Sequence, residues 1–141
     1  MMRWLTHLGG ARVTIGVGAL TLALGESRLG LVMLVANLVS HLPVQLLKRL
    51  VARPRPADAL GRPLALVALP DPFSFPSGHA AAATAVAAPA VLMHPWLGPA
   101  LVPLVVLVGY SRVALRVHHA TDVVAGVALG LGGAVLAMQL L

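Results

Sequence analysis

Long stretches without a charged side chain dominate the 141-residue sequence. A helix that crosses a bilayer needs about 20 consecutive, largely apolar residues. The uncharged stretch over residues 72–111 is about twice that length. Within it, a Pro- and Gly-containing sequence at 94–99 that also carries a tryptophan indicates a turn at the membrane interface. The pattern therefore predicts four apolar helices, at residues 29–47, 79–93, 97–110 and 123–141.

A further apolar segment near the N-terminus, residues 13–25, is short for a membrane span. Extending it back to Trp4 places Arg12 inside the membrane, where the guanidinium must reach the interface or pair with an anion. We expect either a thin or tilted span or a partly embedded helix. The predicted fold is an all-α, polytopic transmembrane helical bundle with about five membrane helices, and four helices is the alternative.

The composition indicates a single integral membrane domain over residues 1–141. Apolar residues make up 59% of the chain and charged residues only 10%, whereas soluble domains carry about 25% charged residues. A soluble protein of this size could not cover its surface with so few charges. We expect no cleaved signal peptide. The absence of cysteine excludes disulfides, thiolate catalysis and cysteine-based zinc sites.

Most of the charge lies in two polar segments, residues 48–71 and 111–122. Two predicted helices separate these segments, so the chain crosses the membrane and returns, and both segments lie on the same face. The net charge is +6, but aromatic residues are only 4% of the chain. Stacking on single-stranded nucleic acid is therefore not supported, and we expect no nucleic-acid partner. The cations are better explained by membrane topology or by a bound phosphate.

Five residues in or beside these segments form a predicted phosphate-binding site. Lys48, Arg55 and Arg112 are three cations that can gather around one anion, because guanidinium groups pair with phosphate oxygens and lysine adds a point charge. Ser77 and Gly78 precede a predicted helix, whose first backbone N–H groups bind anions. The glycine lets the backbone approach the oxygens closely, and the serine can cap the helix or donate its hydroxyl.

Two histidines and one aspartate supply the predicted chemistry. His118 and Asp122 are four residues apart, so one helical turn places them on the same face. A carboxylate bonded to one imidazole nitrogen leaves the other nitrogen free to act as a nucleophile. His79 comes from another segment and can protonate the leaving oxygen. The sequence contains no cluster of carboxylates that would indicate a metal site. We expect neither a metal ion nor another cofactor, since the cations can neutralise the phosphate.

These residues resemble the three motifs of the type 2 phosphatidic acid phosphatase (PAP2) superfamily, K-x6-RP, PSGH and SR-x5-H-x3-D. The fixed positions all match, in the family's order, at Lys48, Arg55, Pro56, Pro76, Ser77, Gly78, His79, Ser111, Arg112, His118 and Asp122. The resemblance extends from about Lys48 to the C-terminus. It implies a helical membrane core and a phosphohistidine intermediate on His118. It also implies acid catalysis by His79, help from Asp122, and phosphate binding by the five residues named above.

The predicted function is a metal-independent membrane lipid phosphatase. A membrane core suits a substrate that enters sideways from the lipid, such as undecaprenyl pyrophosphate or another isoprenyl diphosphate, phosphatidylglycerophosphate, phosphatidic acid or a polyprenyl sugar phosphate. The motifs recognise the phosphate that these lipids share and do not rank them. One alternative is a phospholipid-binding membrane protein without activity, although binding alone does not need His79, His118 and Asp122. The other is a vanadium haloperoxidase-like enzyme, but those relatives are soluble and much larger.

The side of the membrane is predicted differently by charge and by resemblance. Many bacterial members of the family have six spans, and this chain is expected to lack the first. With five spans, most arginines outside the motifs lie on the catalytic face, which by the positive-inside rule would be cytoplasmic. The resemblance implies an extracytoplasmic site in a bacterial plasma membrane, and we favour that assignment.

The remaining polar and small residues receive structural interpretations. Arg53 is expected to be solvated at the surface, and His119 to point away from the site on a helix. Asn37 falls within a span, where hydrogen bonding between helices explains it as well as function does. Gly126 and Gly130 allow close helix packing, which we expect within the monomer rather than in a homodimer.

Overall fold

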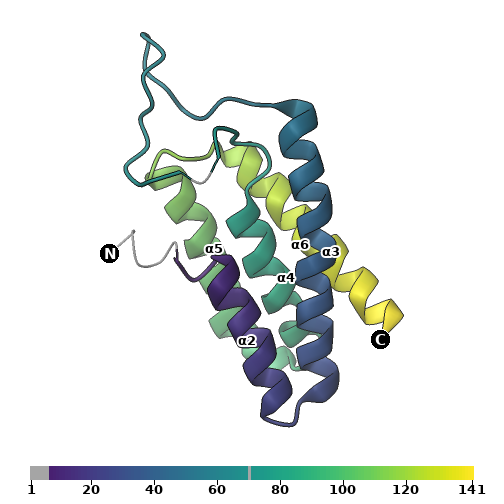
Figure 1. The fold of residues 1–141 in the computed structure, drawn as a ribbon. Helices are drawn as coiled ribbons and strands as arrows, with labels where there is room; N and C mark the ends of the chain where they lie inside the picture. The colour runs from purple at the N-terminus through teal and green to yellow at the C-terminus, as the bar shows by residue number, and fades with distance from the viewer. Residues whose placement is uncertain (1–6, 70) are drawn as a thin grey trace.

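The computed structural model describes residues 7–69 and 71–141 of the chain (Figure 1). The described part folds into α-helices with one short 3-10 helix, and the all-α prediction is confirmed. The elements are α2 (Ala11–Ala23), α3 (Ser27–Val51), α4 (Gly78–Met93), η1 (Pro95–Leu97), α5 (Gly98–Ala114) and α6 (Ala120–Leu140). Each predicted apolar segment corresponds to one of these α-helices. The predicted turn at 94–99 is confirmed as well, because α4 ends at Met93 and η1 follows at Pro95.

Helix length separates the bundle into two groups. Within the described residues, three helical segments are long and apolar enough to cross a membrane, at Ser27–Val51, Pro95–Ala114 and Ala120–Leu140. The helices α2 and α4 are apolar but shorter. At 13 residues α2 rises about 20 Å, less than the hydrocarbon core of about 30 Å, so it agrees with the expected short segment. The extension of that segment to Trp4 lies outside the described residues.

Helices α3, α4 and α6 lie side by side and form the centre of the bundle, with α2 and α5 outside them (Figure 1). Small residues allow this packing. A Cβ atom added at Gly130 of α6 would lie 2.5 Å from the carbonyl oxygen of Ala81, and one at Gly133 would lie 2.8 Å from that of Ala36. A Cβ atom at Gly126 would overlap the carbonyl oxygen of Ser77. The glycines therefore serve packing within the monomer, as predicted.

A polar contact joins the two N-terminal helices inside the apolar bundle. The side-chain amide of Asn37 in α3 donates a hydrogen bond of 2.9 Å to the hydroxyl of Thr14 in α2, and both side chains are buried. In a bilayer each such group needs a partner within the protein. The structural interpretation of Asn37 is therefore confirmed.

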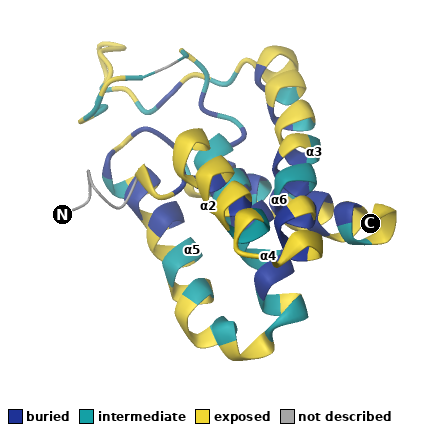
Figure 2. Cartoon of the chain, turned by 60° about the horizontal axis from the view of Figure 1, so that its bottom comes forward, coloured by how far each residue is buried: buried dark blue, intermediate teal, exposed yellow. Residues whose placement is uncertain are grey.

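Large apolar side chains cover the outside of the bundle. Leu20, Leu38, Val106 and Val124, from four different helices, are all exposed, and Figure 2 shows much of α2 and α5 in the exposed class. A water-soluble monomer rarely exposes so continuous an apolar surface. This surface is the one expected of a protein whose solvent is lipid.

The two long polar connections meet at one end of the bundle, at the top of Figure 1. The backbone N–H of Leu66 in the connection between α3 and α4 donates to the carbonyl oxygen of Leu115, after α5, at 3.1 Å. Arg55 donates to the carbonyl oxygen of Val117 at 2.8 Å. The prediction that both polar segments lie on one face is confirmed. The C-terminus lies at the other end of α6 (Figure 1).

Candidate functional site

The first turn of α4 forms one wall of the site. Ser77 is the N-cap residue, and its hydroxyl oxygen accepts a hydrogen bond from the backbone N–H of Ala80 at 3.4 Å, so the predicted cap is confirmed. The backbone N–H of Ser77 donates to the carbonyl oxygen of Asp122 at 2.9 Å, which ties α4 to the start of α6. A Cβ atom at Gly78 would meet Val44 at 3.7 Å, an ordinary contact. Packing therefore does not require a glycine at position 78.

Three cations enter the site from three different parts of the chain. Lys48 lies in the last turn of α3, Arg55 in the connection that follows, and Arg112 in the last turn of α5. All three are buried. Removing a charge from water costs free energy unless the charge is paired and hydrogen-bonded. The predicted cations are thus inside the protein, where an anion would bind them strongly.

Asp71 is outside the set of predicted site residues, yet its carboxylate binds two of these cations. Lys48 Nζ lies 3.0 and 2.9 Å from the two carboxylate oxygens, and Arg55 Nη2 lies 3.2 Å from Oδ1. Burial raises the pKa of Asp71, but the hydrogen bond and charge of Lys48 and the charge of Arg55 outweigh burial, so the pKa is lowered overall. Asp71 is therefore ionised at neutral pH. Asp71 could have been selected from the sequence because it is one of only four acidic residues in the chain.

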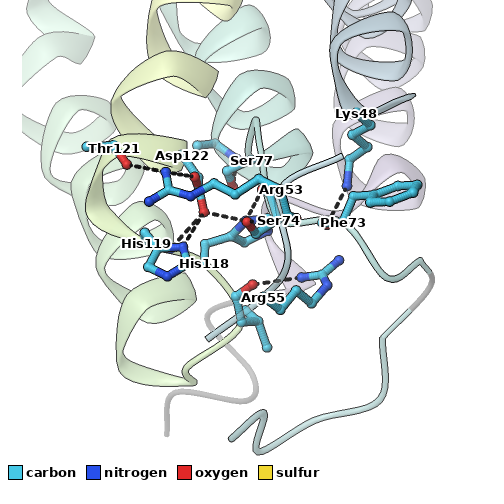
Figure 3. Close-up of polar contacts among 12 residues, drawn as sticks. Lys48, Arg53, Arg55, Phe73, Ser74, Ser77, His118, His119, Thr121 and Asp122 are labelled. Atoms are coloured by element: carbon cyan, nitrogen blue, oxygen red, sulfur yellow. Dashed lines mark hydrogen bonds and ion pairs between the residues drawn. The ribbon is translucent and has the colours of Figure 1, made fainter. Parts of the chain in front are cut away.

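His118 lies in the connection between α5 and α6, with its ring buried against a backbone carbonyl (Figure 3). Its Nδ1 lies 2.6 Å from the carbonyl oxygen of Ser74. A carbonyl oxygen only accepts, so Nδ1 carries the proton and Nε2 carries the lone pair. Burial, together with the charges of Arg112 and Arg55, lowers the pKa of His118 to about 3. The imidazole is therefore neutral at neutral pH.

The expected helical pairing of His118 with Asp122 is wrong. Helix α6 begins at Ala120, so His118 precedes it and the two residues do not share a helical turn. Nδ1 of His118 lies 3.7 Å from Oδ2 of Asp122, too far for a hydrogen bond but close enough for charge interaction. The proton of the ring is fixed by the Ser74 carbonyl instead. A spacing of four residues indicates proximity only where the intervening backbone is helical.

Asp122 is fully buried and is held by Arg53 and His119, two residues outside the set of predicted site residues (Figure 3). Its Oδ1 accepts from Arg53 Nη1 at 2.9 Å. Its Oδ2 accepts from the backbone N–H of His119 at 2.7 Å and lies 3.3 Å from the ring Nδ1 of His119. The expectations of a solvated Arg53 and of a His119 that points away are therefore wrong. The carboxylate both caps α6 and receives an arginine that arrives from the other polar segment.

Ser74 connects these contacts through the backbone. Its N–H donates to the carbonyl oxygen of Arg53 at 2.8 Å, and its hydroxyl donates to that of Pro54 at 2.9 Å. The side chain of Ser74 is fully buried. The backbone of Arg53 and Pro54 therefore fixes the position of Ser74, and the carbonyl group of Ser74 orients the ring of His118.

His79 occupies the first turn of α4, and the N-terminal end of the described chain packs against it. A Cβ atom at Gly9 would lie 2.8 Å from the carbonyl oxygen of His79, and one at Gly10 would lie 3.9 Å from its Nε2. The close approach requires glycine at position 9. His79 and His118 thus come from different elements at the same end of the bundle, as the sequence predicts.

An apolar groove of about 600 Å³ runs between α4, α5 and α6. It is lined almost wholly by aliphatic side chains, among them Val106, Val113, Val123 and Leu131. Its end nearest the site includes Tyr110, Val113, Ala120 and Val123, which are sequence neighbours of Arg112 and Asp122. The lining of the groove does not include the charged residues of the site, but the groove borders the two helices that carry Arg112 and Asp122.

Comparison with known proteins identifies the family. The model described as the PAP2 superfamily matches residues 26–141. The chain belongs to the PAP2 superfamily. An undecaprenyl-diphosphatase of Sulfolobus acidocaldarius is 31% identical over 142 residues, a match that covers 99% of this chain and 69% of that relative. A decaprenylphosphoryl-5-phosphoribose phosphatase of Mycobacterium tuberculosis is 44% identical over 96 residues. That match covers 65% of this chain and half of the mycobacterial protein.

Solved structures of PAP2 enzymes share the fold. A transmembrane PAP2-type phosphatidylglycerolphosphate phosphatase from Bacillus subtilis superposes with a TM-score of 0.76 at 33% identity, covering 99% of this chain and 74% of its own. The structure of LpxE from Aquifex aeolicus gives a TM-score of 0.82 at 25% identity, with coverages of 98% and 83%. The predicted membrane helical bundle, the PAP2 family and the class of PAP2-type phosphatase are confirmed. The chain is an integral membrane protein.

Proposed function

We propose that this PAP2 protein is a metal-independent membrane lipid phosphatase in which His118 forms a phosphohistidine intermediate. The observation that carries the proposal is the hydrogen bond between Nδ1 of His118 and the carbonyl oxygen of Ser74. It leaves the lone pair of Nε2 available for attack on phosphorus. The low pKa of His118 maintains that state at neutral pH, so no general base is needed to activate the nucleophile.

In the first step, Nε2 of His118 bonds to phosphorus while the bond from phosphorus to the leaving oxygen breaks; this is the ester oxygen of a phosphomonoester or the bridging oxygen of a diphosphate. The negative charge of the bound substrate phosphate favours the protonated form of His79, which donates its proton to the departing oxygen. The lipid leaves as an alcohol, or as a monophosphate when the substrate is a diphosphate. The charge on the phosphoryl oxygens is stabilised by the proposed phosphate-binding residues Lys48, Arg55, Ser77, Gly78 and Arg112.

In the second step, water attacks phosphorus, the bond to Nε2 breaks and inorganic phosphate is released. His79 lost its proton in the first step and takes one from the attacking water. The negative charge of Asp122, 3.7 Å from Nδ1, stabilises the positive charge that develops on the phosphorylated ring of His118. The three cations supply the charge neutralisation that magnesium ions supply in kinases and GTPases.

A lipid substrate is supported by the groove between α4, α5 and α6. Its aliphatic lining suits a hydrocarbon tail, and its upper end lies beside the helix ends that carry Arg112 and Asp122. Three of the relatives described above are named for a polyprenyl or glycerophospholipid phosphate substrate. We infer a phosphomonoester or pyrophosphate of a membrane lipid, the class that includes isoprenyl diphosphates, phosphatidylglycerophosphate, phosphatidic acid and polyprenyl sugar phosphates.

For the membrane side, we propose that the site faces away from the cytoplasm of a bacterial cell, in line with the family resemblance. The C-terminus lies at the opposite end of α6 (Figure 1). A green fluorescent protein fused after Leu141 should then fluoresce, and an alkaline phosphatase fused there should be inactive. The reverse pattern would place the site in the cytoplasm.

Phosphate release from purified protein in detergent, with EDTA present, tests the proposed function. The substrates are undecaprenyl pyrophosphate, phosphatidylglycerophosphate, phosphatidic acid and a polyprenyl sugar phosphate. We expect release from at least one lipid, and none from the His118→Ala variant. Release that persists in His118→Ala would reject the nucleophile. Complete inhibition by EDTA that added metal reverses would reject the metal-independent mechanism.

A further inference from the structure

The hydrogen-bond donors of Lys48 are all directed at protein acceptors. An ammonium group has three donors. Lys48 Nζ lies within 3.0 and 2.9 Å of the two carboxylate oxygens of Asp71 and 3.3 Å from the carbonyl oxygen of Phe73. The side chain of Lys48 is only 8% exposed. A phosphate that is to bind Lys48 must therefore take the place of at least one of these acceptors.

Arg55 is engaged by the same residue. Its Nε donates to the backbone carbonyl oxygen of Asp71 at 3.0 Å, and its Nη2 donates to the carboxylate at 3.2 Å. Its Nη1 donates to the carbonyl oxygen of Val117 at 2.8 Å. Asp71 thus joins, through one carboxylate, two of the three cations that the proposed function assigns to the substrate phosphate.

The carboxylate of Asp71 is fixed on one side and accessible on the other. Its Oδ1 accepts from the backbone N–H of Phe73 at 2.9 Å, which sets its position in the connection. The side chain is nevertheless 31% exposed, far more than the two cations it binds. Phosphate and carboxylate oxygens accept the same charge-assisted hydrogen bonds from lysine and arginine. The more accessible anion can therefore be exchanged for an incoming one without exposing either cation.

We propose that Asp71 is an internal counter-anion that pairs with Lys48 and Arg55 when no phosphate is bound and is displaced from them by phosphate. It keeps two buried cations paired and positioned in the empty enzyme, and it weakens phosphate binding by the free energy needed to displace it. It also speeds release of inorganic phosphate, because the carboxylate recaptures the cations. Asp71 is a positioning residue, and the inference rests on the proposed role of Lys48 and Arg55.

The test is direct binding of inorganic phosphate and orthovanadate to purified protein, measured by isothermal titration calorimetry. Asp71→Asn removes the charge and keeps the shape. We expect the Kd for phosphate to fall by about fivefold, since a partly exposed ion pair contributes up to about 1 kcal/mol, which corresponds to a factor of about five. An unchanged or higher Kd would overturn the proposal. Size-exclusion chromatography and thermal unfolding establish that each variant is folded.

Asp58→Asn is the matched control. Asp58 lies in the same connection, where it pairs with the exposed Arg62 at 2.7 Å. The substitution makes the same change in net charge, so its Kd should stay within twofold of the wild type if the effect is local. An equal fall in the Kd of both variants would show that the effect comes from the change in net charge and not from the contacts of Asp71, and it would overturn the proposal.

A second measurement uses the wild-type chain and does not depend on a variant that binds phosphate. The chain holds three aspartates, at positions 58, 71 and 122. With ¹³C-labelled aspartate carboxyls, assigned by the two Asn variants, phosphate should shift the Asp71 signal and leave the Asp58 signal in place. Saturating phosphate without such a shift would contradict the exchange. Both measurements concern phosphate alone, so a failure to hydrolyse lipids would reject the proposed function and leave this inference standing.

Discussion

At the scale of single residues, the position of the proton on the His118 ring determines whether Nε2 has a free lone pair to act as the proposed nucleophile. The Ser74 carbonyl fixes the proton on Nδ1, and burial of the ring together with the nearby charges of Arg112 and Arg55 keeps it from taking a second one. The pKa of about 3 lies below the ordinary value of 6.5, so His118 stays neutral as the pH falls from 7 to 5. In the unfolded chain the imidazole of His118 would be protonated over much of that interval. The unfolded state therefore binds more protons than the folded state, and the contribution of His118 to stability falls as the pH drops below about 6.5.

We predict that the ¹⁵N-labelled ring of His118, assigned with His118→Gln, shows the Nδ1–H tautomer and does not titrate between pH 5 and 8. The Nε2–H tautomer, or a titration midpoint for His118 above pH 6, would contradict the claim that Nε2 is a free nucleophile before substrate binds.

Arg53 is the second residue whose role is decided by a contact rather than by a motif. It reaches the fully buried Asp122 from the other polar segment, and removing one partner of a buried ion pair leaves the other charge unpaired. Its side chain is 36% exposed, which limits the effect. We predict that Arg53→Gln lowers kcat by about tenfold, equivalent to about 1.4 kcal/mol.

Arg49→Gln is the control for that prediction, because Arg49 lies in the last turn of α3 and is exposed. It should keep kcat within about twofold of the wild type. Arg53→Lys should recover part of the loss, since it restores the charge. Equal kcat values for Arg53→Gln and the wild type would show that Asp122 does not need this partner.

Motif spacing predicted the residues of the site better than it predicted their contacts. Lys48, Arg55 and Arg112 could be selected because three cations are conspicuous in a chain with few charges. Ser74 could not, since it acts through a backbone carbonyl that any residue would supply. The partners of Asp122 depend on where α6 begins, and the pairing of Asp71 depends on the path of an irregular connection, neither of which periodicity encodes.

At the scale of elements, close packing of α4 on α6 places Ser77 against the start of α6. A Cβ atom at Gly130 would lie 2.5 Å from the carbonyl oxygen of Ala81 and 2.7 Å from Cβ of Thr84. The helices would have to move apart. We predict that Gly130→Ala lowers the free energy of unfolding by about 1–3 kcal/mol, seen as a lower midpoint of thermal unfolding in detergent.

Gly132→Ala on the same helix separates packing from helix propensity, because a Cβ atom at Gly132 has nothing within 4 Å. Alanine favours a helix over glycine by up to about 1 kcal/mol, so this variant should be as stable as the wild type or more stable. If Gly130→Ala were equally stable, the close approach of α4 and α6 would not be needed for the fold.

The helices themselves were largely predictable, because long uncharged, apolar segments are typical of membrane-spanning helices. The ends were less predictable. Helix α3 continues to Val51, past Lys48 and Arg49, since the last turn of a helix accommodates cations well. Helix α6 starts at Ala120 rather than 123, because Asp122 caps it from within its first turn. Charge marks where the apolar run ends, and hydrogen bonding decides where the helix ends.

At the scale of the whole molecule, the groove between α4, α5 and α6 links the lipid-facing surface to the polar end of the bundle. Val106 lines the groove and is exposed. We predict that Val106→Trp raises the KM for a long-chain lipid phosphate by about tenfold, because the indole fills space that the tail needs. The KM for a short-chain, water-soluble phosphate ester should change little.

The control for this substitution is Val135→Trp, on α6, which places the same side chain on an exposed surface outside the groove. It should leave both KM values near those of the wild type. A Val106→Trp variant that affects long and short substrates equally would show that the groove does not hold the tail.

The most direct test of the mechanism is to trap the covalent intermediate. Enzyme mixed with a lipid substrate labelled in its phosphate is quenched in alkali within milliseconds, digested and sequenced by mass spectrometry. We predict an acid-labile, alkali-stable phosphoryl group on His118 in the wild-type protein and none in the His118→Ala variant. A label on another residue, or rapid turnover with no label on the protein, would contradict nucleophilic catalysis by His118.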